Sequence, residues 1–237
     1  MRWLVSLGAF VSLAENLGAR EGVILLHGLA RTNASMAKLA AALRTEGYIV
    51  ANVDYPSRTA RIDELSEATV AAALRADTLQ DCPRIHFVTH SLGGLLVRSY
   101  FARHRDPRLG RVVMLGPPNQ GSEVADKLQS WWLYQKINGP AGGELGTTRE
   151  AKPNQLGPVS FELGVIAGDR SVNWINSAII PGPDDGKVSV ERTKVAGMKS
   201  HSVVHVTHPF LMTNDAVIAL TIVFLRQGAF SPDETLP

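Results

Sequence analysis

The sequence predicts an α/β fold in which helices cover both faces of a mostly parallel, six-stranded sheet. Short apolar runs alternate with segments of helical periodicity along the chain, and polar residues recur directly after the apolar runs. The chain has 237 residues, of which 45% are hydrophobic and 19% are charged, enough for one well-buried core. We therefore expect a single α/β domain.

Three strands are expected in the first half of the chain, at the apolar runs 23–26, 48–53 and 85–88. Two segments with the apolar spacing of a half-buried helix lie between them. Their marker residues are Met36, Leu39, Ala40 and Leu43, followed by the stop signal Gly47, and then Ile62, Leu65, Thr69 and Ala72. Such alternation favours parallel strands joined by right-handed crossovers.

The second half continues this order after an interruption. A fourth strand is expected at 112–115, and the following residues 116–160 are rich in glycine and proline. We interpret about 122–160 as an insertion over the edge of the sheet. Strands at 163–167 and 203–206 complete the sheet, and a helix marked by Val217, Leu220, Thr221 and Phe224 closes the domain.

The first residues allow two interpretations. Arg2 followed by an apolar stretch to Leu13 has the charge and length of a short signal peptide, whereas Glu15 and a weak cleavage region fit a first helix or strand that caps the sheet. We treat 1–21 as a leader or N-terminal extension and 22–237 as the domain. The protein is periplasmic or secreted if residues 1–19 are a signal peptide, and cytoplasmic otherwise.

Composition excludes several functions. The formal charge of +2 is scattered, without a basic and aromatic stretch, so we expect no nucleic-acid partner. No stretch reaches the roughly 18 to 20 apolar residues of a spanning helix, so we expect no stable membrane insertion. The single cysteine, Cys82, excludes an internal disulfide. Histidines at metal-ligand spacing are missing, and we expect neither a metal nor another cofactor.

Ser91 is the candidate nucleophile. It stands between the apolar strand at 85–88 and an apolar helix that carries Leu92, Leu95 and Leu96. A serine in such a strand, turn and helix sits in strained backbone at the carboxyl edge of a sheet, with its hydroxyl exposed. Gly93 leaves room for the helix to approach the strand. Thr89 occupies the first glycine position of the G-x-S-x-G pattern.

Polar residues follow the other strands in the same way. His27-Gly28-Leu29 follows the first strand, Asn119 to Ser122 follow the fourth, acidic residues follow the fifth, and Thr207-His208 follows the sixth. The carboxyl ends of parallel strands share one edge of the sheet, where ligands and catalytic groups gather. We therefore expect these residues to converge.

Four of these segments resemble the α/β-hydrolase superfamily in its lipase/esterase-like branch. They are Leu-Leu-His-Gly-Leu, Thr-His-Ser-Leu-Gly-Gly, Asp-Asp-Gly-Lys-Val-Ser-Val and Val-Thr-His-Pro-Phe. They appear in the order nucleophile, acid and histidine that this fold uses, and the match extends over roughly residues 22 to 228. Thr89 in place of glycine is the one departure. The resemblance implies a Ser-His-Asp triad that acts on carboxylic esters.

His208 is the candidate base because a serine hydroxyl needs a neighbouring imidazole to remove its proton. It comes just after the last strand and before the last helix, from where it can reach Ser91. We assign His27 and His90 to packing or turn bracing. The remaining histidines carry no catalytic argument; they are His86, His104, His201 and His205.

Three aspartates after the fifth strand compete for the role of the acid. Asp169 lies directly at the end of that strand, whereas Asp184 and Asp185 follow an excursion rich in turn residues, so position alone leaves the choice open. The resemblance favours Asp185, the aspartate directly before Gly186. Asp184 would then brace the turn through backbone amides.

Backbone amides are expected to stabilise the oxyanion. The Leu92 N–H lies at the start of the helix after Ser91, where the helix N-terminus supplies a fixed positive end. The Leu29 N–H would be the second donor, because His27-Gly28 lets the chain turn toward the site. Side-chain identity matters little for either donor.

The aromatic cluster from Trp131 to Tyr134 lies in the middle of the insertion. One interpretation is a helix that buries its aromatic face. The other is a lid or acyl pocket, in which Trp131 and Trp132 contact the hydrophobic part of a substrate. Both tryptophans are therefore candidate substrate-binding residues.

The sequence as a whole predicts a serine hydrolase that cleaves carboxylic esters through an acyl-serine intermediate. Its substrate would be a small-molecule or lipid-like ester. An acyltransferase that hands the same acyl group to another acceptor is the alternative. A non-catalytic binding module on the same fold is a more distant one, since all three triad candidates are present.

Overall fold

The structure is a computed structural model that describes residues 20–172 and 174–230. The predicted leader falls almost entirely on residues outside this range. Within the described part, no helix is both long and apolar enough to cross a membrane.

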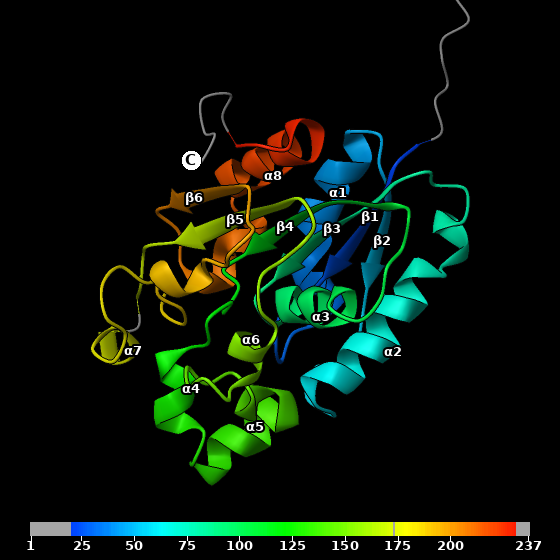
Figure 1. Ribbon diagram of the computed structural model, residues 1–237. Coiled ribbons are helices and arrows are strands. Elements are labelled where there is room, and N and C mark those ends of the chain that lie inside the picture. Colours follow the sequence, from blue (N-terminus) through cyan, green and yellow to red (C-terminus); the bar gives the residue numbers. More distant parts are fainter. Residues whose placement is uncertain (1–19, 173, 231–237) are drawn as a thin grey trace, which may run out of the picture.

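Six parallel strands form one sheet in the order β2-β1-β3-β4-β5-β6 (Figure 1). Their bounds are β1 (Gly22–Leu26), β2 (Ile49–Val53), β3 (Ile85–His90), β4 (Leu109–Leu115), β5 (Leu163–Gly168) and β6 (Ser200–Val204). Every neighbouring pair is parallel, so all carboxyl ends lie at one edge. The predicted fold class is confirmed.

The last strand begins and ends earlier than its apolar residues predict. We expected residues 203–206, whereas β6 spans Ser200–Val204, and the Val206 N–H already bonds to the Val204 carbonyl in a turn at 2.8 Å. β6 is an edge strand, and its register with Gly164 to Gly168 of β5 sets its bounds. Backbone pairing with β5 therefore includes the polar residues from Ser200 to Ser202 in the strand.

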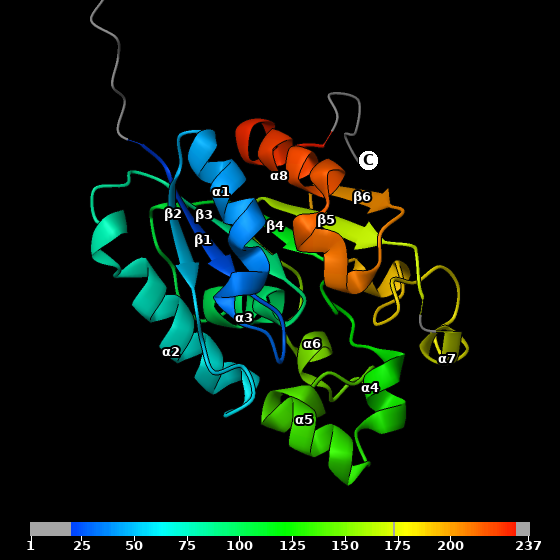
Figure 2. The same ribbon diagram turned by 180° about the vertical axis from the view of Figure 1, so that it is seen from behind.

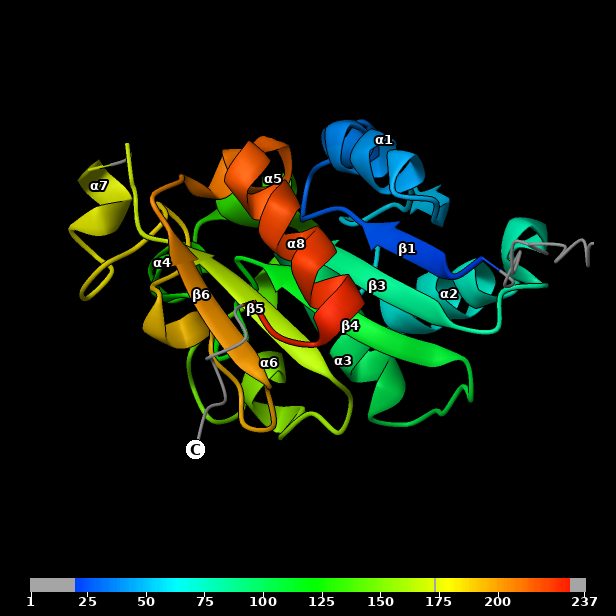
Figure 3. The same cartoon turned by 90° about the horizontal axis from the view of Figure 1, so that it is seen from above.

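Two pairs of helices cover the sheet. Helices α1 (Ala37–Thr45) and α8 (Asp215–Gln227) lie on one face, toward the viewer in Figure 3. Helices α2 (Ile62–Leu74) and α3 (Leu92–Phe101) lie on the other. Both faces of the central strands are therefore buried, as their continuous apolar runs predict.

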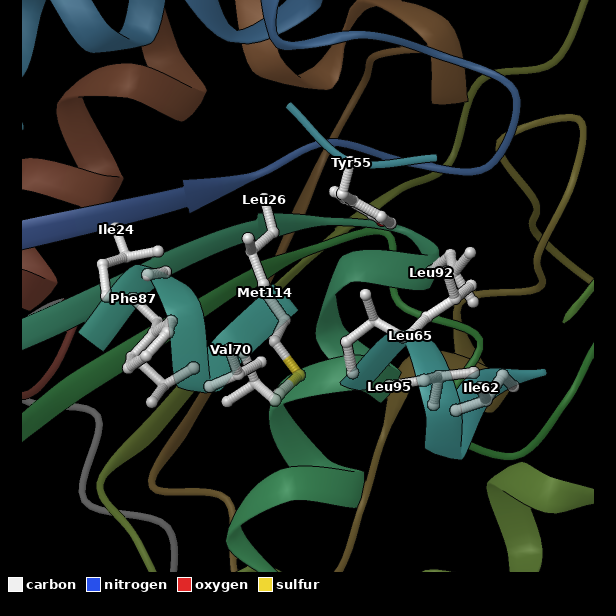
Figure 4. Packing of buried hydrophobic residues seen from close by; sticks show 14 of the residues in the cluster. Ile24, Leu26, Tyr55, Ile62, Leu65, Val70, Phe87, Leu92, Leu95 and Met114 are labelled. Atoms are coloured by element: carbon white, nitrogen blue, oxygen red, sulfur yellow. The ribbon is translucent and has the colours of Figure 1, made fainter. Parts of the chain in front are cut away.

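Alternate side chains of β1 point into two separate cores. Ile24 and Leu26 pack with residues of α2 and α3, as Figure 4 shows, whereas Val23 and Leu25 pack with α1 and α8. All four are fully buried. Full burial of such a side chain contributes about 1.5 to 3 kcal/mol, so β1 is anchored from both faces. The loop that follows β1 starts from a rigid base.

The insertion predicted after the fourth strand consists of three helices. They are α4 (Glu123–Leu128), α5 (Trp132–Gly143) and α6 (Lys152–Gln155), and they lie together beyond the carboxyl edge of the sheet (Figure 2). The φ angle of 63° at Gly139, followed by Pro140, kinks α5. The remaining short helices are α7 (Trp174–Ser177), η1 (Asn33–Met36), η2 (Asp77–Leu79), η3 (Glu191–Thr193) and η4 (His208–Thr213).

Arg98 of α3 holds the insertion against the sheet. Its buried guanidinium donates to the Asn119 carbonyl at 2.8 Å and to the carbonyls of Pro153 and Gly157 at 3.2 and 2.8 Å. Asn119 in turn donates from its side chain to the Thr193 carbonyl at 2.8 Å. The helix that follows Ser91 and the insertion are thereby joined through buried hydrogen bonds of the two terminal guanidinium nitrogens, whereas Nε of Arg98 has no partner within the described residues.

Candidate active site

Ser91 lies in a strained turn between β3 and α3. Its backbone has φ 52° and ψ −119°, a conformation that residues other than glycine rarely adopt. The Ser91 N–H donates to the Leu115 carbonyl of the neighbouring β4 at 2.9 Å. The turn brings Ser91 to the wall of a cavity at the carboxyl edge of the sheet.

Gly93 and Thr89, on either side of Ser91, each suit the backbone position that they occupy. A Cβ at Gly93 would lie 2.7 Å from the Leu26 carbonyl, so only glycine lets α3 approach β1 this closely. Thr89 is a fully buried residue of β3, paired in register with Leu26 and Met114. Its branched side chain therefore lies in a strand and not in the turn, where it would be disfavoured.

His208 lies on the same cavity as Ser91, at the start of η4. Its Nδ1 lies 2.7 Å from Oδ2 of Asp185, whose side chain is fully buried. The other oxygen, Oδ1, accepts from the Lys187 and Val188 amides at 3.0 and 2.9 Å. A carboxylate held in this way fixes Nδ1 as the protonated nitrogen and leaves Nε2 free to accept a proton.

The other two candidate aspartates have different partners. Asp184 accepts the Gly186 amide at 2.7 Å and the Ser177 hydroxyl at 3.0 Å, and so braces the turn that carries Asp185. Asp169 lies 2.9 Å from Nδ1 of the exposed His205. Of the three, the structure brings only Asp185 to His208.

Two backbone N–H groups near Ser91 lack an acceptor within the described residues. The Leu92 N–H stands at the first position of α3, where no intrahelical acceptor exists. The Leu29 N–H follows the turn after β1, and the next amide, of Ala30, donates to the Ser57 hydroxyl at 3.0 Å. These are the two amides that the sequence predicts as oxyanion donors.

His27 braces the loop that carries Leu29. Its imidazole is fully buried, stacks on Tyr55 at 4.2 Å between ring centroids, and donates from Nδ1 to the Gly28 carbonyl at 2.9 Å. The Tyr55 hydroxyl donates to the His27 carbonyl at 2.7 Å. Burial lowers the pKa of His27, so the ring stays neutral and Nε2 can accept the Tyr55 amide.

His90 connects the turn at Ser91 to the base. Its Nε2–H donates to the His208 carbonyl at 3.1 Å, and the two rings lie 4.7 Å apart. Burial, followed by the nearby His208, lowers the pKa of His90 well below its usual value. Its Nδ1 is buried without a protein partner in the described part of the chain. His90 is therefore a neutral brace.

The cavity that contains Ser91 and His208 has a volume of about 530 Å³. Most of its wall is apolar. Pro118, just before the insertion, lines it, and the residues of the insertion that line it are Ser122, Val124, Ala125, Tyr134, Ile137, Asn138 and Leu145. This volume lies within the usual range for small-molecule sites.

The structure does not bring Trp131 and Trp132 to this cavity. Their side chains are 63% and 72% exposed, and neither lines its wall. The alternative of a helix that buries its aromatic face is also wrong for these two residues. Tyr134 and Ile137 of α5 face the site instead, because the helix turns that side toward the sheet.

The sequence analysis missed Gly116 and placed Ser122 only among the polar residues expected at the edge of the sheet. Gly116 has φ 54°, and a Cβ there would lie 3.0 Å from Asp185 Oδ2 and 3.1 Å from His208 Nδ1. Ser122 lines the cavity and donates to the Lys187 carbonyl at 2.7 Å. Both follow β4, so their place after a predicted strand was the available signal.

Metal-binding side chains do not cluster in the described residues, since no group of three or more histidine, cysteine, aspartate or glutamate side chains is placed to hold an ion. The polar side chains on the cavity wall include the Ser91 hydroxyl, the imidazoles of His90 and His208, and the cationic groups of Arg31 and Lys187.

Comparison with known proteins decides the family. A model described as the alpha/beta hydrolase family matches residues 23–219, most of the chain. The chain belongs to the alpha/beta hydrolase family. A comparison with curated protein sequences gives no significant match.

Several solved structures share the fold of this chain at low sequence identity. The mature form of the lipase BlEst2 from Bacillus licheniformis is 21% identical, with a TM-score of 0.64 over 89% of this chain and 93% of that chain. A structure of the metagenome-derived lipolytic enzymes LipS and LipT is 18% identical, with a TM-score of 0.61 over 89% and 95%.

A gene product of Listeria innocua is similar to the same degree, with 18% identity and a TM-score of 0.60 over 91% of this chain and 97% of that chain. The chain spans 50% of the propeptide form of the Bacillus lipase. At these identities the likeness shows the fold of this hydrolase and not its substrate.

Proposed function

We propose that this hydrolase is a serine esterase that cleaves carboxylic esters with Ser91 as nucleophile, His208 as base and Asp185 as the acid. One observation carries the proposal: a serine in strained backbone shares a cavity with an imidazole whose far nitrogen is hydrogen-bonded to a buried carboxylate. This is the arrangement that makes a weak hydroxyl nucleophile reactive.

In the acylation step, Nε2 of His208 takes the proton of the Ser91 hydroxyl while Oγ attacks the ester carbonyl. Asp185 holds the imidazole in the required tautomer and stabilises the imidazolium that forms, at the 2.7 Å contact with Nδ1. The tetrahedral intermediate then expels the alcohol, which receives the proton from His208. An acyl-serine at Ser91 remains.

In the deacylation step, water attacks the acyl-serine while His208 takes its proton. The bond from the acyl carbon to Oγ then breaks, the acid leaves, and His208 returns the proton to Ser91. In both steps the negative charge develops on the former carbonyl oxygen. The amides of Leu29 and Leu92 are the unpaired donors that would bind it, and α3 adds the positive end of its dipole. Loss of one such donor costs about 10² to 10³ in rate.

The substrate has a hydrophobic part in this proposal. Val124, Ala125, Ile137 and Leu145 contribute apolar side chains to the wall of the cavity that contains Ser91, and Tyr134 lines it too. Burial of each methylene of an acyl chain there would contribute about 0.8 kcal/mol. Esters with medium acyl chains therefore fit better than acetates.

Substitution of the nucleophile tests the proposal. Ser91→Ala should lower the hydrolysis of p-nitrophenyl esters by about 10⁴ to 10⁶ and leave the circular dichroism spectrum unchanged. A fluorophosphonate probe should label Ser91 in the wild-type protein. Ser122→Ala is the matched control, because Ser122 lines the same cavity with its hydroxyl bonded to the Lys187 carbonyl, and it should keep the label.

A loss of only a few fold in Ser91→Ala, or labelling that survives it, would refute the assignment. The same assay, repeated with an alcohol as acceptor, distinguishes the acyltransferase alternative. If the protein forms the new ester in preference to the free acid, its function is acyl transfer from the same acyl-serine and not hydrolysis.

A further inference from the structure

The charged side chains on the active-site cavity are all cationic. Arg31 and Lys187 line its wall together with the imidazoles of His90 and His208. No described carboxylate lines it, since Asp185 lies behind His208 and is fully buried. An apolar cavity with a purely positive rim attracts an anionic ligand.

Arg31 has no protein partner that would explain its position. Its backbone N–H bonds to the Gly28 carbonyl at 3.3 Å, but within residues 20–172 and 174–230 no ion pair or hydrogen bond holds its guanidinium. Asp54, the acid in the adjoining hollow, instead accepts the Asn33 amide at 3.0 Å and lies 3.3 Å from His27. The half-buried guanidinium is therefore available to a ligand.

The position of Arg31 relative to His208 indicates which part of the ester it would meet. The loop after β1 runs beside η4, which begins at His208 (Figure 2), and η1 packs against η4. The charge of Arg31 also contributes to the lowered pKa of His90, whose ring contacts His208. Arg31 and His208 therefore line the same cavity from neighbouring segments of the chain.

The two halves of an ester must occupy different ends of this cavity. His208 delivers a proton to the departing alcohol, so the alcohol lies on the side of His208, where η4 contacts η1, the element just after the loop that carries Arg31. The acyl chain then lies along the apolar wall of α4 and α5, which includes Val124, Ile137 and Leu145. The cation at Arg31 is thus placed to meet a group on the alcohol.

We propose that the natural substrate is an ester of a hydrophobic acyl chain with an alcohol that bears an anionic group, and that Arg31 binds this anion. The inference rests on the esterase function proposed above and specifies its substrate class. A carboxylate, phosphate or sulfonate would satisfy the guanidinium with charge-assisted hydrogen bonds, and Lys187 adds positive charge at the rim.

Two chromogenic esters with the same acyl chain test this inference. One is the hexanoyl ester of a hydroxy-nitrobenzoate, whose alcohol is anionic, and the other is the hexanoyl ester of the matching neutral hydroxy-nitrobenzamide. The readout is the ratio of kcat/KM for the anionic ester to that for the neutral ester. We expect a ratio above one in the wild-type protein that falls as salt screens the charges.

Arg31→Gln should lower this ratio by about tenfold, the effect of a charge-assisted hydrogen bond worth about 1.5 kcal/mol. Lys187→Gln should lower it by less, because its side chain is exposed. Arg75→Gln is the matched control. Arg75 is an exposed arginine after α2 that does not line the cavity, and its loss should leave the ratio unchanged.

The outcomes separate the two proposals. Turnover of the neutral ester that depends on Ser91 supports the esterase function. If the anionic ester is then not preferred, or if the preference survives in Arg31→Gln, the inference about Arg31 is wrong and the esterase function stands. If neither ester is cleaved in a way that depends on Ser91, the esterase function fails, and the inference fails with it.

Discussion

At the scale of single residues, the three candidate aspartates, Asp169, Asp184 and Asp185, test which one is the acid of the triad. Only the Asp185 carboxylate contacts His208, whereas Asp169 contacts His205 and Asp184 contacts the Gly186 amide. Asp185→Asn leaves a similar shape but favours the wrong tautomer of His208. We predict a loss of about 10³ to 10⁴ in kcat for p-nitrophenyl ester hydrolysis.

Asp169→Asn is the matched control for this substitution and should stay within about tenfold, or 1.4 kcal/mol. Asp184→Asn should do the same, because the amide oxygen can still accept the Gly186 N–H. If Asp169→Asn proved the most damaging of the three, the acid would be misassigned and the 2.7 Å contact of Asp185 with His208 would be structural.

Gly116 supports the same pair from the neighbouring strand. Its φ is 54°, and an added Cβ would meet Asp185 and His208 at 3.0 and 3.1 Å. We predict that Gly116→Ala lowers kcat at least tenfold, about 1.4 kcal/mol, because the methyl group displaces the imidazole. Gly47→Ala separates this effect from backbone strain, since Gly47 also has a positive φ, of 92°, but open space around it.

Both glycine variants should lose stability in urea unfolding, because each places an alanine at a positive φ. Gly116→Ala should lose more, because its methyl group also meets Leu211 at 2.8 Å. Only Gly116→Ala should lose activity under folding conditions. Equal activities in the two variants would show that the contact with Asp185 and His208 is tolerated.

At the scale of elements, α5 presents two different faces. Ile137 lines the cavity, whereas Trp132 is directed to solvent with Lys136 over its ring at 6.0 Å. Truncation of Ile137 removes part of the apolar wall, at a cost of about 0.8 kcal/mol for each methylene that contacts the chain. We predict that Ile137→Ala lowers kcat/KM for a decanoyl ester by about threefold to tenfold and barely affects the acetate.

Trp132→Ala provides the comparison on the same helix and should change neither substrate appreciably. If Trp132→Ala lowers kcat/KM for the decanoyl ester more than Ile137→Ala does, Trp132 and not Ile137 is the main contact of the acyl chain. It would also require α5 to reorient when substrate binds.

At the scale of the whole molecule, three buried histidines make stability depend on pH. Burial lowers the pKa of His27, His86 and His90 below the usual value of 6.5. In the unfolded chain these imidazoles take up protons near pH 6.5, whereas in the folded protein they stay neutral to lower pH. The unfolded state then binds more protons, so stability is full above this pH and falls below it.

We predict that the free energy of unfolding, measured in urea, decreases from pH 7 to about pH 5.5. Each such imidazole contributes up to about 1.4 kcal/mol for each pH unit. His86→Gln should flatten this dependence, because His86 accepts the Arg111 amide at 2.9 Å only in its neutral form. A slope in His86→Gln equal to that of the wild-type protein would contradict the prediction.

The sequence by itself determined the order of strands and helices, the parallel sheet and the position of Ser91 at its edge. These features follow from short-range patterns: apolar runs, helical spacing, and glycines such as Gly93 next to the nucleophile. The place of His208 followed from the same logic, because the carboxyl ends of parallel strands must meet.

Position in the sequence left open which aspartate reaches His208, and only the resemblance favoured Asp185. The tertiary structure places Asp185 there at 2.7 Å, because the path of the excursion after Asp169 depends on how it folds back, for example through the bond from Asn176 to the Gly186 carbonyl at 2.7 Å. It also decided which face of α5 meets the cavity. A helix with apolar residues on several sides has no preferred face until a partner surface is present, and here the sheet edge selected Tyr134 and Ile137 over the two tryptophans.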